Sequence, residues 1–301
     1  MRGAVVTLGT FDGVHRGHQA VLAEVTGRAR DKRLTSVLVT FDPHPLVVLN
    51  PAAAPKLLTL PDEKRELVTA QGVERFVVLP FTPAVAQLDA EAFVRRLRDE
   101  YDMQELVMGY DHGFGRGRAG DVESVKRLGR AQQFGVTVVD GVRDDGQPIS
   151  STVIRAAVAH GDLDAAARWL GRSYGIRGRV VRGAGRGRTI GVPTVNLDPP
   201  DPRKLLPPDG VYAVQVIVGG QATGNGRRYG GMMNQGPRPT FGEQARTLEV
   251  HLFDFEGELY GETITVEWVR RLREVRAFPS REDLVAQLER DRQAARATLN
   301  R

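Results

Sequence analysis

In the first half of the chain, short apolar runs alternate with segments in which apolar residues recur every three or four positions. The short runs predict buried strands, and the periodic segments predict amphipathic helices. The expected strands are Val5–Leu8, Ser36–Phe41, Arg75–Leu79, Glu105–Met108 and Thr137–Val139, and the expected helices lie near Gln19–Arg30, Asp62–Ala70, Ala90–Glu100 and Val122–Gln133. This alternation predicts a doubly wound parallel α/β sheet, which binds its ligand beyond the carboxyl ends of the strands.

From Tyr174 onward, the pattern changes to short β-rich runs separated by turns rich in glycine and proline. The expected strands are Gly178–Arg182, Val211–Val218, Thr247–Phe253 and Thr263–Val269. Such spacing predicts a small antiparallel β-barrel, followed by a terminal amphipathic helix from Arg281 to Ala297 with Ser280 as its N-cap. Since the helical pattern of the first half ends at Gly171-Arg172-Ser173, we expect one domain at residues 1–172 and a second at 173–301.

The composition narrows the class of protein. The chain has 301 residues, enough for two cores, and its 41% hydrophobic and 26% charged residues are typical of a soluble globular protein. It has no cysteine, which excludes disulfides, thiolate-bound zinc and a cysteine nucleophile. The first expected strand leaves no room for a signal peptide, and no apolar run approaches the ~20 residues of a membrane span. We therefore expect a cytoplasmic protein with no membrane partner.

The stretch from Gly9 to His18 is the one around which the chain is organised. It follows the first expected strand and leads into the first expected helix, with His15 and His18 three positions apart at the helix start. A helix start presents unpaired N–H groups and the positive end of the helix dipole, which suit an anion. Residues three apart lie on one helix face, so both imidazoles can stabilise charge that develops on phosphate oxygens.

Two other interpretations of this stretch stay open. One is an ordinary glycine-rich turn with two exposed histidines, and the other is zinc ligation by His15 and His18. Because the first helical turn carries no acidic residue and the chain no cysteine, a zinc site would need a ligand from elsewhere. The phosphate interpretation is therefore favoured.

Further motif loops follow the other expected strands. Asp42-Pro43-His44-Pro45 follows the second strand, and Gly109–Gly115 follows the fourth. After the last strand, a Ser-Ser-Thr sequence at 150–152 opens a helix that also carries Arg155. A second phosphate cradle, made of N–H groups, hydroxyls and a guanidinium, is one interpretation, and an ordinary N-cap with a surface arginine is its competitor.

Three features of the second half carry polar chemistry. Gly183–Arg188 is a glycine-arginine loop that can fold over phosphates, although it is neither a P-loop nor a dinucleotide fingerprint. If Thr194–Asn196 is extended, its hydroxyl and amide lie on one face as hard oxygen ligands of the kind Mg²⁺ accepts, but a polar strand start explains them equally well. Glu249 lies opposite the apolar face of its strand. A solvent-facing carboxylate is the favoured interpretation there, and a proton acceptor for a hydroxyl nucleophile is the alternative.

In this order, the motifs of both halves resemble those of the bacterial bifunctional riboflavin kinase/FAD synthetases. The resemblance covers nearly the whole chain. It rests on Gly9–His18, Thr40–Pro45, Gly109–Gly120 and Ile149–Arg155 in the first half, and on Gly191–Leu197, Pro207–Tyr212, Asn234–Phe241, Glu249–Phe255 and Tyr260-Gly261 in the second. It implies a Rossmann-like nucleotidyltransferase domain at 1–172 and a riboflavin kinase barrel with a terminal helix at 173–301.

The resemblance implies two successive reactions. The barrel domain transfers a phosphoryl group from ATP to the ribityl hydroxyl of riboflavin and gives FMN. The N-terminal domain transfers AMP from a second ATP to the FMN phosphate and gives FAD and pyrophosphate. Riboflavin, FMN and ATP are thus the expected small-molecule substrates, Mg²⁺ the expected cofactor, and a monomer or weak homo-oligomer the expected assembly.

The resemblance also implies roles for individual residues. In the N-terminal domain, His15 and His18 are catalytic. The residues implied for ATP binding there are Gly9, Thr10, Phe11, Asp12, Gly17, Asp111, Ser150, Ser151, Thr152 and Arg155, and those implied for flavin binding are Phe41, Pro43 and His44. In the barrel, the resemblance implies Glu249 as the base, Thr194 and Asn196 as Mg²⁺ and phosphate ligands, and Gly183, Gly185, Arg186 and Arg188 as the loop over the phosphates.

Two segments depart from the family's pattern. The family usually has an aromatic residue where His112 stands and a bulkier one at Gly113, within a loop expected to help hold nucleotide or flavin. The segment Gly230–Gly236 lacks the usual apolar residues beside Asn234, which we interpret as a packing change. Both histidines at the helix start are intact.

Two rival hypotheses stay open. One is an adenylyltransferase for another phosphorylated substrate, with the barrel as a recognition module. The Pro193–Asn196 motif together with Glu249 argues against it. The other is a nucleic-acid-binding protein, which rests on the net charge of +5 alone. Since no Lys/Arg run is interleaved with aromatic residues, we expect no nucleic-acid partner.

Overall fold

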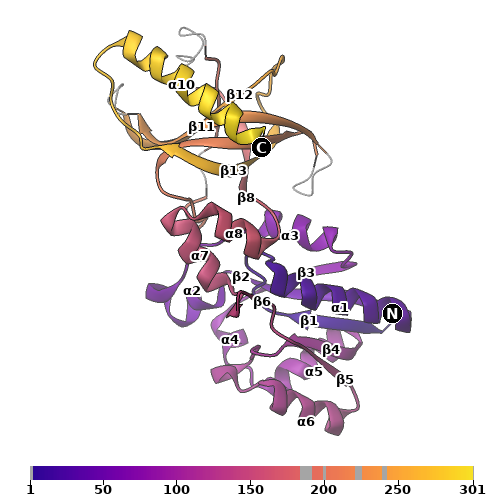
Figure 1. The fold of residues 1–301 in the computed structure, drawn as a ribbon. Helices are drawn as coiled ribbons and strands as arrows, with labels where there is room; N and C mark the ends of the chain where they lie inside the picture. The colour runs from indigo at the N-terminus through magenta and orange to yellow at the C-terminus, as the bar shows by residue number, and fades with distance from the viewer. Residues whose placement is uncertain (1–2, 184–191, 199–200, 221–225, 239–242, 301) are drawn as a thin grey trace. The chain divides into compact units, whose positions relative to one another are not determined.

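The computed structural model describes residues 3–183, 192–198, 201–220, 226–238 and 243–300 (Figure 1). The chain forms two compact units, Met1–Val153 and Ile154–Arg301, which we call the first and second unit. Each unit has its own hydrophobic core. A domain boundary at 172/173 stays a prediction.

The first unit is a doubly wound parallel sheet with the strand order β3-β2-β1-β4-β5, as predicted (Figure 1). Its elements are β1 (Ala4–Leu8), α1 (Arg16–Lys32), β2 (Thr35–Asp42), α2 (Pro45–Leu49), η1 (Pro51–Ala53), α3 (Pro61–Ala70), β3 (Arg75–Pro80), α4 (Pro83–Ala86), α5 (Ala90–Tyr101), β4 (Met103–Gly109), η2 (Arg116–Arg118), α6 (Val122–Gln132), β5 (Gly135–Val139), β6 (Arg143–Asp144) and β7 (Gln147–Pro148). The predicted strands and long helices are confirmed. The short α2 and α4 lie outside the predicted set because one or two turns are too few to show a helical period.

Two apolar layers hold this sheet between its helices. Strand β1 is buried along its whole length, and its side chains alternate between the two faces. Val5 packs with residues of α1 and α3 on one face, and Val6 packs with residues of α5 and α6 on the other. Because β1 is the central strand, the loop that follows it is fixed at the middle of the carboxyl edge of the sheet.

The second unit contains a closed antiparallel barrel with the strand order β10-β11-β12-β9-β8-β13 (Figure 1). Helix α7 (Ser151–His160) begins at the end of the first unit, and the remaining elements are α8 (Leu163–Leu170), β8 (Tyr174–Val181), β9 (Val195–Leu197), β10 (Gly210–Val218), β11 (Arg227–Arg238), β12 (Glu243–Leu252), β13 (Thr263–Arg273) and α10 (Arg281–Leu299). The barrel and the terminal helix, capped by Ser280, are as predicted. Strand β11 lies outside the predicted set. It contains three glycines, which have low β-propensity, and it pairs with neighbours on both edges.

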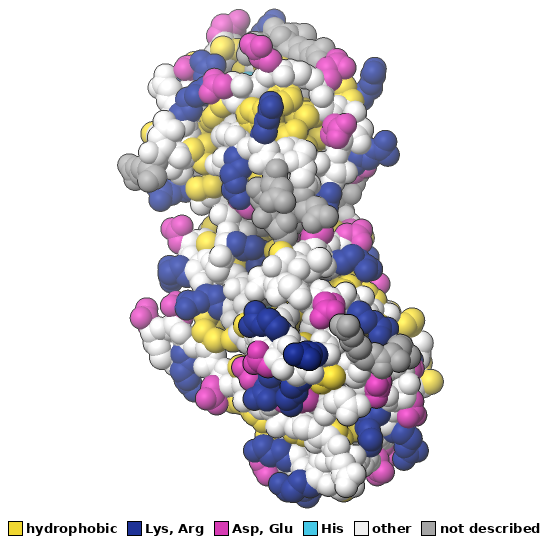
Figure 2. All heavy atoms as spheres, turned by 90° about the vertical axis from the view of Figure 1, so that its right-hand side faces the viewer, with side chains coloured by type: hydrophobic (Ala, Val, Ile, Leu, Met, Phe, Trp, Pro, Cys, Tyr) yellow, Lys and Arg dark blue, Asp and Glu magenta, His cyan; other side chains and the backbone are white. Residues whose placement is uncertain are grey.

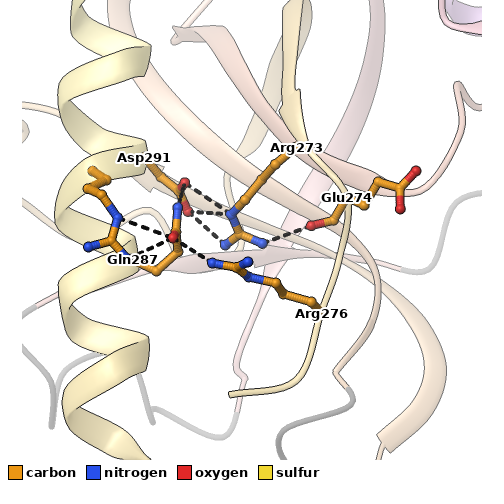
Figure 3. A network of polar contacts seen from close by, with 6 residues as sticks. Arg273, Glu274, Arg276, Gln287 and Asp291 are labelled. Carbon is orange, nitrogen blue, oxygen red and sulfur yellow. Dashed lines mark hydrogen bonds and ion pairs between the residues drawn. The ribbon is translucent and has the colours of Figure 1, made fainter. Parts of the chain in front are cut away.

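A nearly buried ion pair fixes α10 to the barrel (Figure 3). The Arg273 guanidinium at the end of β13 contacts both carboxylate oxygens of Asp291 on α10, with the shortest contact at 2.7 Å. Gln287 donates a further hydrogen bond to Asp291 at 2.8 Å and accepts one from Arg276. The Asp291 side chain is only 4% exposed. A buried carboxylate with this many donors needs its cationic partner, since a lone buried charge is costly.

We expect Asp291→Asn to destabilise the barrel by about 3 kcal/mol, because it leaves the Arg273 charge without its partner in a nearly dry environment. Urea unfolding followed by the fluorescence of the buried Trp268 measures this loss. The matched control is Asp254→Asn, which removes another ion pair with α10, to Arg296. That pair is exposed, so its loss should not change the unfolding midpoint measurably. If both variants lowered the unfolding midpoint equally, burial would not explain the contribution of the Arg273–Asp291 pair to stability.

Candidate functional site

The turn between β1 and α1 is shaped by glycine and by close ring packing. Gly9 has a φ of 153° and donates its N–H to the Val39 carbonyl at 3.0 Å. A Cβ at Gly9 would lie 3.2 Å from the Phe11 ring and 3.4 Å from the His112 ring. The turn that follows β1 therefore lies directly against the loop that follows β4, and both are at the carboxyl edge of the sheet.

The two histidines lie together at the start of α1. Their rings are stacked with centroids 3.6 Å apart, and the Phe11 ring lies 4.7 Å from that of His18. His15 caps the helix, because its Nδ1 accepts the His18 N–H at 3.3 Å. A neutral His15 ring therefore carries its proton on Nε2. A Cβ at Gly17 would approach this ring to 3.2 Å, which explains the glycine between the histidines.

Asp12 ties the turn to the segment before α3. Its carboxylate is 1% exposed and accepts the N–H groups of Leu58 and Thr59, both at 2.9 Å. Thr59 also donates its hydroxyl to Asp12 at 3.1 Å and accepts the Gly13 N–H at 3.0 Å. The contacts that the structure gives the Asp12 carboxylate are thus with the protein itself, and they set the shape of the turn.

Lys64 is a residue of this site that the sequence analysis missed. Its side chain is buried, and its ammonium donates to the Thr10 carbonyl at 2.7 Å and to the Thr40 hydroxyl at 3.4 Å. Burial lowers the pKa of Lys64, and the carboxylates of Asp12 and Asp42 oppose that shift. A lysine at this place in α3 has no sequence signature, because Thr10 lies far from it along the chain.

The loop after β2 borders a pocket beside this lysine. The pocket is lined by Thr10, Thr40, Phe41, Asp42, His44, Leu57, Thr59, Pro61, Lys64, Phe76 and Val78. Of the predicted flavin-binding residues, Phe41 packs edge-on against Phe81, and His44 caps α2 through its Nδ1. Pro43 lies between them after a cis peptide bond.

The start of α7 also contacts the first turn. The Ser151 hydroxyl donates to the Asp12 carbonyl at 2.9 Å, and the Ser150 hydroxyl accepts the Val153 N–H at 3.4 Å. The structure therefore brings this predicted hydroxyl cluster to the same edge as Gly9–His18. Thr152 is the next residue of α7, and Arg155, in the same helix, falls within the second unit.

The loop after β4 holds Asp111 at the surface and the neighbouring His112 inward. The Arg118 side chain donates to the Asp111 carbonyl at 2.9 Å and helps to close this loop. The Nε2 atom of His112 is out of contact with solvent and has no hydrogen-bond partner among the described residues. Burial, and secondarily Arg118, lower the pKa of His112 to about 4. The ring is thus neutral near pH 7 and contains an unsatisfied polar atom.

In the barrel, the structure brings three of the predicted polar residues together. Glu249 on β12 pairs with Asn196 on β9, and the Thr194 hydroxyl donates to Glu249 Oε1 at 2.7 Å. A Cβ at Gly183 would lie 2.0 Å from the Asn196 amide nitrogen, so a larger residue there would displace the Asn196 side chain. Gly185, Arg186 and Arg188 lie outside the described residues, so their predicted role over the phosphates stays a prediction.

His251 is a second residue that the sequence analysis did not assign to a site. It follows Glu249 by two positions on β12, and its Nδ1 lies 2.6 Å from the Pro193 carbonyl. Burial is the main cause that lowers the pKa of His251, and the bond to Pro193 opposes it. The signal that could have found it is the alternation of β12, which puts both side chains on one face.

The donor set of the barrel site suits a hard cation. Thr194, Asn196 and Glu249 offer a hydroxyl, an amide and a carboxylate oxygen, the ligand types that Mg²⁺ accepts beside phosphate and water. Because the Thr194 hydroxyl gives its proton to Glu249, its lone pairs stay available to a cation. Within the described part of the chain, no group of three or more His, Cys, Asp or Glu side chains could hold a metal ion, which gives zinc ligation by His15 and His18 no support.

Two family models match this chain, one in each half. Residues 1–153 match the family model for FAD synthetase, and residues 170–299 match the model for riboflavin kinase. A relative from Pseudomonas fluorescens named bifunctional riboflavin kinase/FMN adenylyltransferase is 41% identical over 98% of this chain and 93% of its own. A Bacillus subtilis relative of the same name is 37% identical over 97% and 91% of the two chains.

A solved structure shares the fold along nearly the whole chain. It has a TM-score of 0.84 and 34% identity, and it covers 98% of this chain and 94% of its own. That structure, from Streptococcus pneumoniae, is titled a macrolide-efflux protein, a name that differs from those of the curated relatives. No helix in the described ranges of the present chain is long and apolar enough to cross a membrane.

The pKa of His112 predicts how the first unit responds to acid. The ring has a pKa of about 4 when folded and about 6.5 when unfolded, so the unfolded state binds the extra proton between these values. Stability should therefore fall as pH falls from about 6.5 towards 4, by up to ~1.4 kcal/mol per pH unit.

We expect His112→Phe to remove this part of the acid sensitivity and to stabilise the first unit at pH 7 by about 1 kcal/mol, because it deletes a buried polar atom without a partner. Both tryptophans lie in the second unit, so hydrogen exchange of the β4 and β5 amides at pH 5 and pH 7 is the suitable measurement. A variant that loses stability with acid as steeply as the unchanged protein would contradict this assignment.

Proposed function

The chain belongs to the family of bifunctional riboflavin kinase/FMN adenylyltransferases, and from that premise we propose how its residues carry out the two reactions. The chain is an enzyme with both activities: FMN adenylyltransferase in its N-terminal part and riboflavin kinase in its C-terminal part. Its substrates are riboflavin, FMN and ATP. We propose the residue roles, the Mg²⁺ requirement and the assignment of the two activities to residues 1–172 and 173–301.

In the adenylyltransferase reaction, a phosphate oxygen of FMN attacks the α-phosphorus of ATP, and the bond to pyrophosphate breaks. The nucleophile is already an anion, so the site needs no base. It needs positioning and stabilisation of charge on the α-phosphate oxygens. His15 and His18 supply ring N–H donors at the start of α1, where the N–H groups and the helix dipole also favour an anion.

The other predicted residues of this domain complete the phosphate site. Gly9, Thr10, Phe11 and Gly17 form and support the turn, while Ser150, Ser151, Thr152, Arg155 and Asp111 contact the remaining parts of ATP. The 2.9 Å hydrogen bond from Ser151 to the Asp12 carbonyl supports the convergence of the two segments. Asp12 maintains the shape of the turn by accepting hydrogen bonds from the N–H groups of Leu58 and Thr59. Phe41, Pro43 and His44 take the flavin, at the pocket beside them.

In the kinase reaction, the ribityl hydroxyl of riboflavin attacks the γ-phosphorus of ATP, and ADP leaves. This nucleophile is a neutral alcohol, so a base that accepts its proton lowers the barrier. Glu249 is that base. The single observation that supports the assignment is the 2.7 Å hydrogen bond from Thr194, which orients the carboxylate beside the segment proposed to bind phosphate. It favours the proton acceptor over the ordinary surface carboxylate that the sequence pattern alone prefers.

Mg²⁺ is the proposed cofactor of the kinase site. Thr194 and Asn196 would hold it, since their oxygens are of the hard type that it prefers. When bound, the ion neutralises charge on the ATP phosphates. The loop residues Gly183, Gly185, Arg186 and Arg188 cover the same phosphates in this proposal. Gly183 packs against Asn196, which supports a close approach of that loop to the site.

The proposal assigns no nucleic-acid partner. On the face in Figure 2, Lys and Arg side chains are interspersed with Asp and Glu in both units and do not form a continuous basic surface. Such mixed charge suits compact phosphorylated substrates rather than a long polyanion. We also propose that the protein acts in the cytoplasm, where the ATP that both reactions consume is available, as a monomer or weak homo-oligomer.

We expect Glu249→Gln to lower the rate of FMN formation from riboflavin by about 10²–10⁴-fold, the usual contribution of a general base, because an amide cannot take the proton. FAD formation from supplied FMN should be unchanged. Product chromatography with each substrate measures both rates in the same preparation.

The matched control is His18→Gln, which keeps a side-chain N–H donor but removes the imidazole ring beside His15. It should slow FAD formation from FMN and leave FMN formation from riboflavin intact. If either variant lost both activities while remaining folded, the assignment of one reaction to each domain would be wrong.

A further inference from the structure

Thr194, the proposed Mg²⁺ ligand, lies just beyond a strand ladder. Strand β9 pairs with β12 through Val195 with Val250 and Asn196 with Glu249. Continued by one position, this register puts Thr194 opposite His251. Since β9 begins at Val195, the backbone at Pro193 and Thr194 is not part of the strand. At this point, a side chain on β12 can take the place of a main-chain hydrogen bond between the two strands.

His251 makes that contact. Its Nδ1 lies 2.6 Å from the Pro193 carbonyl, which can only accept, so Nδ1 carries the proton. The ring is 9% exposed and packs edge-on against Phe253, with centroids 5.6 Å apart. Val192, the residue before Pro193, packs against the apolar cluster that also contains Phe253. The donor nitrogen is thus held among packed side chains of the barrel.

We infer that His251 is a positioning residue of the kinase site: by holding the Pro193 carbonyl, it keeps the Thr194 hydroxyl against Glu249 and its lone pairs directed to the cation. The inference rests on the proposed roles of Thr194 and Glu249. Two hydrogen bonds act in series, from His251 to Pro193 and from Thr194 to Glu249, and one peptide unit joins them. Loss of the first releases the segment on which the second depends.

The expected size of the change in Mg²⁺ affinity follows from residues that orient metal ligands in other proteins. Residues that orient a metal ligand typically change metal affinity by about 10–100-fold when they are removed. An effect through Thr194 should appear in the Mg²⁺ requirement and not in the binding of nucleotide without metal. A purely structural histidine would instead lower stability and leave the Mg²⁺ requirement of the folded fraction unchanged.

The test compares variants of the full chain that differ at the donor atom. His251→Phe keeps a planar ring but has no N–H, and His251→Asn places an amide nitrogen near the position of Nδ1. His251→Leu is a second variant without a donor. His160→Phe is the matched control, because His160 also has its Nδ1 near a main-chain carbonyl, that of Ala156, but is exposed on α7.

Two quantities are measured for each variant. The first is the Mg²⁺ concentration that gives half the maximal rate of FMN formation, and the second is the gain in ADP affinity on adding Mg²⁺, by titration calorimetry. FAD formation from FMN and Trp268 fluorescence report that both domains are folded. We expect His251→Phe and His251→Leu to raise the Mg²⁺ concentration needed for half the maximal rate about tenfold, and to reduce the gain in ADP affinity on adding Mg²⁺ by a similar factor. In His251→Asn and His160→Phe, both quantities should stay close to those of the unchanged protein.

A double variant tests whether His251 acts through Thr194. Thr194→Val should itself raise the Mg²⁺ requirement, and adding His251→Phe should raise it no further, because the two residues form one chain of contacts. Effects that multiply would overturn the inference, as would a folded His251→Phe with an unchanged Mg²⁺ requirement or a His251→Asn as impaired as His251→Phe. If Thr194→Val left the Mg²⁺ requirement unchanged, the proposed role of Thr194 would be wrong, and the inference would fall with it.

Discussion

In each domain, a buried side-chain nitrogen holds a main-chain carbonyl near a strand end, within a segment that belongs to the proposed site. In the first unit, Lys64 donates to the carbonyl of Thr10, two residues after the buried strand β1 ends at Leu8. In the barrel, His251 donates to the Pro193 carbonyl, just before β9 begins. A polar main-chain group that is buried without a partner is costly, so these contacts fix the backbone where catalysis needs accuracy.

The two proposed sites differ in whether they provide a base, and the difference follows from the chemistry of their nucleophiles. A phosphate oxygen needs no base, and the adenylyltransferase site accordingly offers stacked imidazoles and a helix start to stabilise the α-phosphate. An alcohol must lose a proton, and the kinase site offers a carboxylate held by a hydroxyl at 2.7 Å. The contrast accounts for the proposed use of His15 and His18 in one domain and of Glu249 in the other.

The sequence predicted the elements with a clear period, since burial on one or both faces leaves a direct trace in the order of apolar residues. It did not predict β11, whose glycines weaken the signal and whose place is set by barrel closure. The sequence also did not predict contacts between residues that lie far apart along the chain. Lys64 meets Thr10 and His251 meets Pro193 only after the chain has folded. The proposed role of Glu249 depends on Thr194, which approaches it from the segment before β9. Local motifs, such as the histidine pair, could be found because their geometry is set within one helical turn.

The most direct test of the account is a time course of flavin products from the unchanged protein, incubated with riboflavin, ATP and Mg²⁺ and separated by chromatography. The account predicts that FMN forms first and that FAD follows from it, with ADP and pyrophosphate as the respective by-products. If riboflavin remained unphosphorylated, or if FMN accumulated and supplied FMN were never converted to FAD, the claim that one chain carries out both reactions would be contradicted.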